Sequence, residues 1–242
     1  MRKTNKNLTK QILTLMLAFV MVFTGMGIGS WGVDTAWADE TGWDGTEISK
    51  PSQSEDGTYK IKNAAELAWF AGLVNGKLTD GTKQDLNANA VLTADIDLNN
   101  KIWTPIGPAS AWGSTTAYQG SFDGNGKTIS HLYINNGAQF SGLFGGINGE
   151  IKNLSITQSD VTANTGAILV GLSHAKGNIQ NCAVTNSALK PTATKLVNSA
   201  ALCATNKGLI ANCYGYNNKI LCSFPILNGN ATVNGNVGGL VG

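Results

Sequence analysis

The sequence predicts an all-β protein, a right-handed parallel β-helix (β-solenoid) with a short helix packed near its N-terminal end. Two observations indicate this class. The 242 residues include 30 glycines and 26 asparagines, which favour tight turns with positive φ and disfavour helix interiors. Short strand-like segments also recur along the chain. Repeats of about 20 to 50 residues are typical of solenoids, and parallel crossovers are right-handed by default.

The first 38 residues have the layout of a secretory signal peptide. An apolar run over residues 12–23 follows a basic start, and small residues frame a cleavage site before Asp39. The run is shorter than the ~20 residues needed to span a bilayer. We therefore expect cleavage of residues 1–38 and no membrane span after signal removal. The residues that carry the layout are Arg2, Lys3, Lys6, Lys10, Ala36 and Ala38.

The charge pattern excludes several classes of partner. The formal net charge of the whole chain is only +2, and Arg2, the only arginine, lies in the signal. A nearly neutral mature surface gives no electrostatic footprint for nucleic acid or an anionic membrane. Without an arginine, the mature chain also has no guanidinium fork to grip a phosphate or carboxylate.

A polar linker over residues 39–58 and a helix over residues 63–75 come next. The linker is rich in turn residues and lacks an apolar period. In the helix, Asn63 can cap the first turn while Glu66 reaches back to it, and Gly76 supplies a stop. One apolar face follows the i, i+3, i+4, i+7 spacing and is formed by Leu67, Phe70, Ala71 and Val74.

The solenoid is expected over residues 59–242, with its ladders set by four aligned segments. Their first residues lie 22, 28 and 31 residues apart and are Ile129, Ile151, Ile179 and Ile210. Two positions later stand His131, Asn153, Asn181 and Asn212, followed by Leu132, Leu154, Cys182 and Cys213. Stacked coils at ~4.8 Å would align these residues, with isoleucines inside and asparagine amides bonded along the axis. His131 is then a ladder substitution rather than a general base.

The repeat length fixes the expected coil. Three strands of ~5 residues with three turns of about 2 to 6 residues bracket the observed spacings. From about Val91 onward the chain has room for about five or six such coils. The final VGGLVG opens another repeat, so we expect either a continuing chain or an uncapped edge.

Several segments resemble a known family. The segments GLFGGINGEIKNLSI, GLIANC and GGLVG are similar to the GLUG motif, a degenerate repeat of bacterial cell-surface proteins that also occurs in immunoglobulin-A-cleaving metallopeptidases. Upstream, AAELAWFAGLVNG, LTADIDL, WTPIG and FDGNGKTI resemble the segment that precedes these repeats in Gram-positive surface proteins. The resemblance covers residues 58–242 and implies a surface repeat protein, whereas it says little about activity.

The motifs that suggest chemistry have simpler interpretations. The GNGKT segment resembles the end of a P-loop, but Ser121 occupies a required glycine position and a strand-like run follows. We expect a β-turn there. The carboxylates Asp95, Asp97 and Asp123 form no tight cluster for Ca²⁺, and the chain has no HExxH motif. We therefore predict no catalytic residue, no metal site and no cofactor.

The four cysteines allow two interpretations. Cys182 and Cys213 share a register, whereas Cys203 and Cys222 occupy less regular places. An exported chain could form two disulfides in three possible pairings. Parallel side chains are poorly aimed for the disulfide torsion, so buried free thiols are favoured.

A loop insertion around residues 99–122 carries the candidate ligand-binding residues Trp103, Trp112 and Tyr118, with Phe122 at its end. Tryptophan and tyrosine stack on sugars and anchor protein contacts. The alternative, which we favour, is that these rings cover the end of the solenoid core.

The predicted function is a non-enzymatic scaffold or adhesion protein, secreted or held in the cell wall, that forms the N-terminal part of a longer surface protein. The motivation is the repeat, the signal and the lack of a nucleophile, base and orienting group in one set. The expected partners are glycans or host or cell-wall proteins. The alternatives are a β-helical carbohydrate-active enzyme and a glycan-binding module that uses Trp103 and Trp112.

Overall fold

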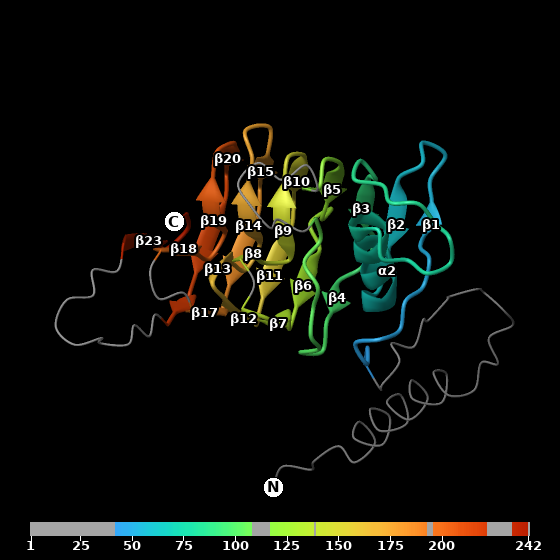
Figure 1. Ribbon diagram of the computed structural model, residues 1–242. Helices are drawn as coiled ribbons and strands as arrows, with labels where there is room; N and C mark the ends of the chain where they lie inside the picture. Colours follow the sequence, from blue (N-terminus) through green and yellow to red (C-terminus); the bar gives the residue numbers. More distant parts are fainter. Residues whose placement is uncertain (1–41, 108–116, 138, 193–195, 222–233, 242) are drawn as a thin grey trace, which may run out of the picture. The chain divides into compact units, whose positions relative to one another are not determined.

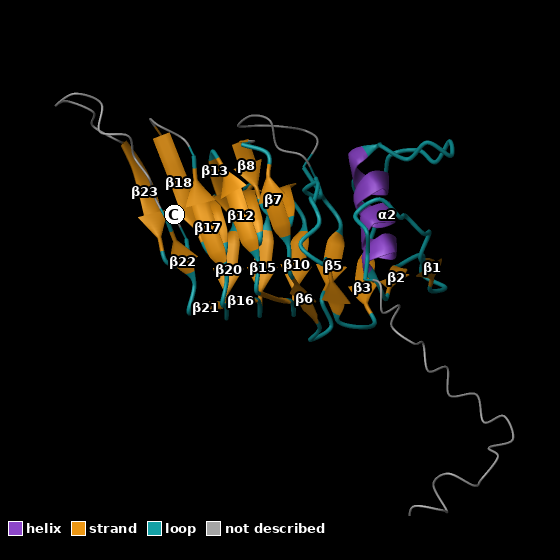
Figure 2. Cartoon of the chain, turned by 90° about the horizontal axis from the view of Figure 1, so that it is seen from below, coloured by secondary structure: helices purple, strands orange, loops and turns teal. Residues whose placement is uncertain are grey.

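The computed structural model describes residues 42–107, 117–137, 139–192, 196–221 and 234–241. They belong to one compact unit, a parallel β-solenoid with one described helix, as the sequence predicts (Figures 1 and 2). The expected signal peptide lies outside the described residues. No helix within the described ranges is long and apolar enough to cross a membrane.

Five sheets surround the interior, and among the described strands only β1 and β2 pair in antiparallel fashion. The first sheet contains β1 (Ser52–Gln53), β2 (Tyr59–Ile61), β3 (Ala90–Leu92), β5 (Ser121–Asp123), β10 (Glu150–Lys152), β15 (Asn178–Gln180) and β20 (Leu209–Ala211). The second contains β4 (Ile96–Asp97), β6 (Thr128–Ser130), β11 (Ser155–Thr157), β16 (Ala183–Thr185) and β21 (Tyr214–Tyr216). The third contains β7 (Tyr133–Asn135), β12 (Asp160–Ala163), β17 (Ala188–Pro191) and β22 (Lys219–Ile220).

The fourth and fifth sheets complete each coil. The fourth contains β8 (Gln139–Ser141), β13 (Thr165–Ala167), β18 (Leu196–Ala200) and β23 (Asn234–Gly238). The fifth contains β9 (Phe144–Ile147), β14 (Val170–Ser173) and β19 (Cys203–Asn206). We number the coils by their strands: coil 1 starts at β3, coil 2 is β5–β9, coil 3 is β10–β14, coil 4 is β15–β19 and coil 5 starts at β20. The expected three strands per coil are therefore wrong, because five shorter strands form each complete coil.

A five-residue period explains the short strands. The inward side chains Ile151, Ile156 and Val161 are fully buried, and Asn153 and Gln158 between them have φ of 53° and 51°. These left-handed residues bend the chain from one sheet to the next. The first turn of the coils places Asn125, Asn153, Asn181 and Asn212 in this conformation, and the second turn places Asn99, Asn100, His131, Gln158, Asn186 and Asn217.

The predicted ladder needs one correction. Ile151 pairs with Ile179, and Ile179 pairs with Ile210, as predicted. Their partner in coil 2 is Phe122, whereas Ile129 pairs with Ile96 and Ile156 in the second sheet. His131 accordingly lies in the second turn and not beside Asn153. The segment that contains Ile129 and His131 fits the first or the second turn by sequence, because both turns have the same five-residue pattern.

Asparagine amides bond along the solenoid axis, as predicted. Asn181 Nδ2 donates to Asn153 Oδ1 over 3.0 Å, and Asn153 Nδ2 donates to Asp123 Oδ1 over 3.0 Å. In the second turn, Asn217 Nδ2 donates to Asn186 Oδ1 over 2.8 Å. These three bonds hold the turns at Asn153, Asn181 and Asn217 in register with the turns of the preceding coils.

Helix α2 (Ala64–Asn75) lies at the N-terminal end of the stack (Figure 1). Asn63 caps it by accepting from Glu66 N over 2.9 Å, and Gly76 ends it in the left-handed conformation. The carboxylate of Glu66 accepts from Lys62 N, one residue before the position we expected. The whole of the predicted apolar face is buried, and the opposite side also contributes the buried residues Trp69 and Leu73.

The second face of α2 is buried because residues 42–58 pack along it. Ser49 N donates to Ala65 O over 3.1 Å, and Lys50 Nζ lies 5.6 Å from the centroid of the Trp69 ring. The segment also supplies β1. Residues 42–58 are therefore part of the compact unit, and the interpretation of this stretch as a linker is wrong.

The described residues of the expected insertion around residues 99–122 continue coil 1 and lead into β5 of coil 2. Ile102 and Ile106 continue the parallel pairing with Tyr133 and Phe144 of coil 2. Gly107 O then accepts from Gly146 N over 2.6 Å, and Tyr118 N donates to Gly146 O over 2.9 Å. The residues on either side of 108–116, Gly107 and Tyr118, thus both bond to one residue of β9.

Candidate functional site

Aromatic side chains fill the interior where α2 meets the first coils. Phe70 lies 6.1 Å from Tyr118 and 6.0 Å from Phe122, and Phe144 lies 5.7 Å from Tyr118, measured between ring centroids. All four rings have at most 2 % exposure. Phe122 is therefore a core residue, as the favoured interpretation of this block predicts.

Tyr118 is a core residue and not a ligand contact. Its side chain is fully buried, and its hydroxyl donates to Ala88 O over 2.8 Å. Burial raises the pKa of the phenol. The candidate binding role of Tyr118 is therefore wrong, because its ring and its hydroxyl are both occupied inside the protein.

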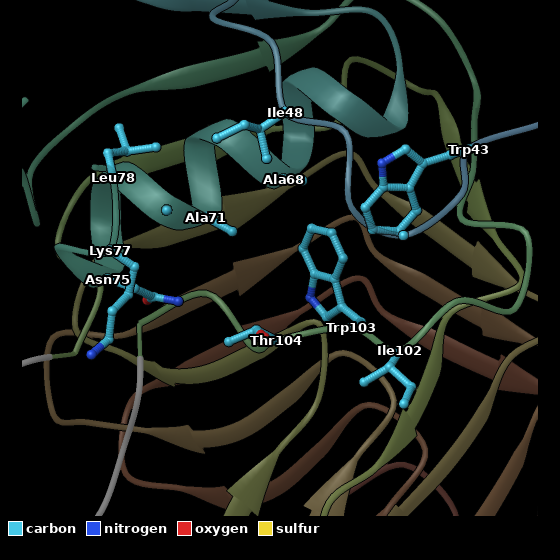
Figure 3. A pocket seen from close by; sticks show the side chains of 12 residues that line it. Trp43, Ile48, Ala68, Ala71, Asn75, Lys77, Leu78, Ile102, Trp103 and Thr104 are labelled. Atoms are coloured by element: carbon cyan, nitrogen blue, oxygen red, sulfur yellow. The ribbon is translucent and has the colours of Figure 1, made fainter. Parts of the chain in front are cut away.

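Trp103 is 2 % exposed, and its Nε1 donates to Leu143 O over 3.3 Å. It nevertheless lines a pocket of about 240 Å³ between α2 and residues 102–104 (Figure 3). Trp112 lies outside the described residues. Of the three predicted ligand-binding residues, Trp103 is thus the one that the structure places at a pocket wall.

The pocket wall beside Trp103 carries Trp43, which the sequence analysis did not single out (Figure 3). The Trp43 ring meets that of Trp103 edge-on, with centroids 6.1 Å apart and planes at 63°. Asn99 Nδ2 donates to Trp43 O over 3.1 Å, and Trp43 Nε1 donates to Glu47 O over 2.9 Å. The sequence feature that could have indicated Trp43 is the presence of a large apolar ring within an otherwise polar stretch.

A short turn sets the position of Trp43. Asp44 Oδ1 accepts from Thr46 N over 2.7 Å and from Glu47 N over 3.0 Å. These bonds lower the pKa of the Asp44 carboxyl, with the Thr46 amide as the main cause. The sequence Asp-Gly-Thr therefore folds locally into a turn that directs the indole against the solenoid.

The rim of the pocket mixes apolar and polar groups. Ile48 and Ile102 are 53 % and 68 % exposed, and the exposed Lys77 and Thr104 add an ammonium group and a hydroxyl. Asn75 is already engaged, since it donates to Pro105 O over 2.9 Å and accepts from Gly107 N over 3.0 Å. Such a pocket suits a small ligand with an apolar face and polar edges. The remaining lining residues are Gly45, Ala68, Ala71, Gly72 and Leu78.

The carboxylates considered as Ca²⁺ ligands accept backbone N–H bonds instead, locally at Asp97 and Asp123 and from the next coil at Asp95. Asp95 Oδ1 accepts from Thr128 N, Asp97 Oδ1 from Asn99 N and Asp123 Oδ1 from Asn125 N, at 2.7 to 2.8 Å. Asp97 Oδ1 also lies 2.9 Å from His131 Nδ1. Within the described ranges, no group of three or more His, Cys, Asp or Glu side chains could hold a metal ion.

Three of the four cysteines are described, and all three are free thiols. Cys182 and Cys203 are buried, whereas Cys213 is half-buried. Burial raises the pKa of the Cys203 thiol to about 12. The structure agrees with the favoured interpretation of buried free thiols for Cys182 and Cys203, while Cys222 lies outside the described residues.

The fold and the pocket define a parallel β-solenoid with an aromatic pocket at its helical end, and comparisons with known proteins add its relatives. No protein-family model matches the chain. It is 32 % identical over 121 residues to a protein of Evansella cellulosilytica provisionally named a Gly-rich membrane protein, a match that covers 49 % of this chain and 13 % of that protein.

Two further proteins are similar. Halomucin of Haloquadratum walsbyi is 32 % identical over 147 residues, a match that covers 57 % of this chain and 2 % of halomucin. The chain therefore matches only a small part of either relative. A crystal structure from Bacteroides ovatus, provisionally named an immunoglobulin A1 protease, superposes with a TM-score of 0.45 and 17 % identity over 72 % of this chain and 66 % of that one.

Proposed function

We propose that this protein is a non-enzymatic scaffold that is secreted or held at the cell surface. The observation that supports the proposal is that the same strand register repeats between successive coils. Equivalent residues pair from coil to coil in every sheet, as in the register of Ile151 with Ile179 and Ile210. Such a stack sets a length and presents flat side faces, and further coils leave the cross-section unchanged.

The relatives support a surface location. One relative is named as a membrane protein and the other as a mucin, and both are much longer than this chain. The expected signal over residues 1–38 and the resemblance to GLUG-motif repeats of bacterial surface proteins agree with export. Under this proposal the chain acts as a segment that spaces other parts of a larger surface protein.

The modular character can be tested by removing one coil. Deletion of residues 151–178 joins Glu150 to Ile179, and Glu150 is the register partner of Asn178. We expect this variant to keep its β-sheet circular dichroism and its cooperative unfolding. A matched deletion of residues 151–164 removes half a coil and should unfold the chain. Loss of structure in both variants would contradict a modular scaffold.

The location can be tested by expressing the full chain in a Gram-positive host. We expect the protein in the cell-wall or medium fraction, digestible by protease added to intact cells, with Asp39 at its N-terminus by mass spectrometry. Retention in the cytoplasm with Met1 intact would overturn the export part of the proposal.

The pocket favours a second candidate function, binding of a glycan. We expect soluble cell-wall oligosaccharides to perturb tryptophan fluorescence, and Trp43→Ala to weaken binding by about fivefold or more, since aromatic contacts contribute about 1 kcal/mol or more. Tyr216→Ala is the matched control, because this tyrosine is 70 % exposed and lies in coil 5, far along the stack. Equal affinity of both variants would reject the pocket as the binding site.

A further inference from the structure

The second turn of the coils is closed by a ladder of buried hydroxyl groups. Ser187 Oγ donates to Thr185 O over 2.8 Å and accepts from Ser159 N over 3.1 Å. Ser159 Oγ likewise donates to Thr157 O and accepts from Leu132 N. Each hydroxyl thus links its own turn to the backbone of the preceding coil.

The first turn uses cysteine in the same role. Cys213 Sγ contacts Ala211 O over 3.2 Å and accepts from Cys182 N over 3.4 Å. Cys182 Sγ similarly contacts Gln180 O over 3.2 Å and Ile151 O over 3.8 Å. Sulfur is a weaker hydrogen-bonding atom than oxygen, so serine would close this turn at least as well. What cysteine adds at these two positions is thiol chemistry.

The two thiols are near enough to react with each other, and rotation of the parallel side chains would bring them to the disulfide torsion. Each lies two residues beyond the end of its strand, and the strand ends, Gln180 and Ala211, are register partners. Adjacent strands lie about 4.8 Å apart, within the Cα separation of about 4.4 to 6.8 Å that disulfides span. Cys182 is 1 % exposed, whereas Cys213 is half-buried. A reagent from solution therefore reaches Cys213 first, because Cys182 is buried.

The surroundings also favour the thiolate of Cys213. Hydrogen bonds from the Cys182 thiol and the Cys182 backbone N–H lower the pKa of Cys213 to about 7. The hydrogen bond with Cys213 raises the pKa of the Cys182 thiol, and burial raises it further. A thiolate flanked by a neighbouring thiol is the arrangement in which an attacking and a resolving cysteine work together.

We propose that Cys213 and Cys182 form a thiol–disulfide exchange site that takes low-molecular-weight disulfides as oxidant. The Cys213 thiolate attacks one sulfur of the external disulfide, which forms a mixed disulfide and releases one thiolate. Cys182 then loses its proton and attacks Cys213 Sγ, which expels the second external thiol. Two protein thiols are oxidised, the external disulfide is reduced to two thiols, and a covalent bond joins coils 4 and 5.

The test uses the reduced full chain and oxidised glutathione as the probe. Trypsin places the four cysteines on separate peptides, since lysines lie between them in the sequence. We expect a cross-linked peptide pair containing Cys182 and Cys213. Cys182→Ser should stop at a glutathione adduct on Cys213, and Cys213→Ser should give neither product. Serine is the residue that the second turn already uses, so both variants should fold.

Cys203→Ser is the matched control and should react like the unmodified chain. With iodoacetamide at neutral pH, Cys213 should react at least tenfold faster than Cys203, in proportion to its larger thiolate fraction. Equal alkylation rates, a cross-link between other cysteines, or unchanged oxidation in Cys213→Ser would each overturn the proposal.

Discussion

The helical end of the solenoid and its repeated coils are built from different side chains. Around α2 the interior holds aromatic rings such as Phe70, Tyr118 and Phe122, whereas coils 3 and 4 are filled by Ile, Leu and Val. A coil stacked on an equivalent coil needs the same side-chain volume at each level, which an aliphatic ladder supplies. A helix against a coil leaves a wider and irregular space, which large rings fill.

The largest expected effect tests the helical end. Phe70→Ala should lower the free energy of unfolding by about 4 kcal/mol, because it leaves a large cavity among Tyr118 and Phe122. Ile156→Val in the repeated coils should cost only about 1 kcal/mol. Urea unfolding followed by circular dichroism measures both changes. Equal costs would show that the two regions do not differ in packing as described.

The next effect tests how closely the coils approach. Gly149 and Gly208 occupy equivalent corners before the first sheet, and a Cβ at either would clash with the carbonyl oxygen of Gly120 or Gly177. We expect Gly149→Ala to destabilise the fold by about 3 kcal/mol. Gly239→Ala is the control, since a Cβ there meets no atom within 4 Å, and its unfolding midpoint should stay nearly unchanged.

A smaller effect tests the turn ladder. Asn186 has φ of 50° and accepts the amide of Asn217. Asn186→Ala should cost about 1 to 2 kcal/mol, because alanine is strained in the left-handed region. Asn186→Gly keeps the backbone conformation and should cost less. If glycine proves the worse replacement in thermal unfolding, the amide bond matters more than the backbone.

The smallest effect concerns pH and acts on the repeated coils. Burial lowers the pKa of His174, with Lys207 as a lesser cause, so the folded state favours the neutral ring. The unfolded chain then binds more protons as the pH falls below about 6.5. Stability should be full above this pH and decline slightly below it. His174→Gln should flatten that decline in urea midpoints measured at pH 5 and pH 8.

The sequence predicted the solenoid because the evidence for it is local and repeated. Glycine and asparagine positions, the helix cap at Asn63 and the register of Ile151 with Ile179 all follow from spacing. The alignment of Ile129 with Ile151 was wrong because the first and second turns of a coil share one five-residue pattern. Only pairing with the neighbouring coils determines to which turn the segment belongs. The predicted number of strands per coil was wrong because left-handed residues such as Gln158 divide sequence segments that look like single strands.

The pocket was harder to predict because its walls come from three separate stretches of chain. Trp43, Asn75 and Trp103 meet only after residues 42–58 fold back along α2. Burial of Tyr118 depends on the ring of Phe144 in the next coil. No spacing within one segment contains this information.

Gly107 and Tyr118, which flank residues 108–116 in the sequence, both bond to Gly146. This makes the position a natural site for display engineering. An epitope or affinity tag grafted in place of these nine residues would be anchored at both ends by the same strand. Antibody recognition of the graft on living cells would then report directly which side of the solenoid is presented to the surroundings.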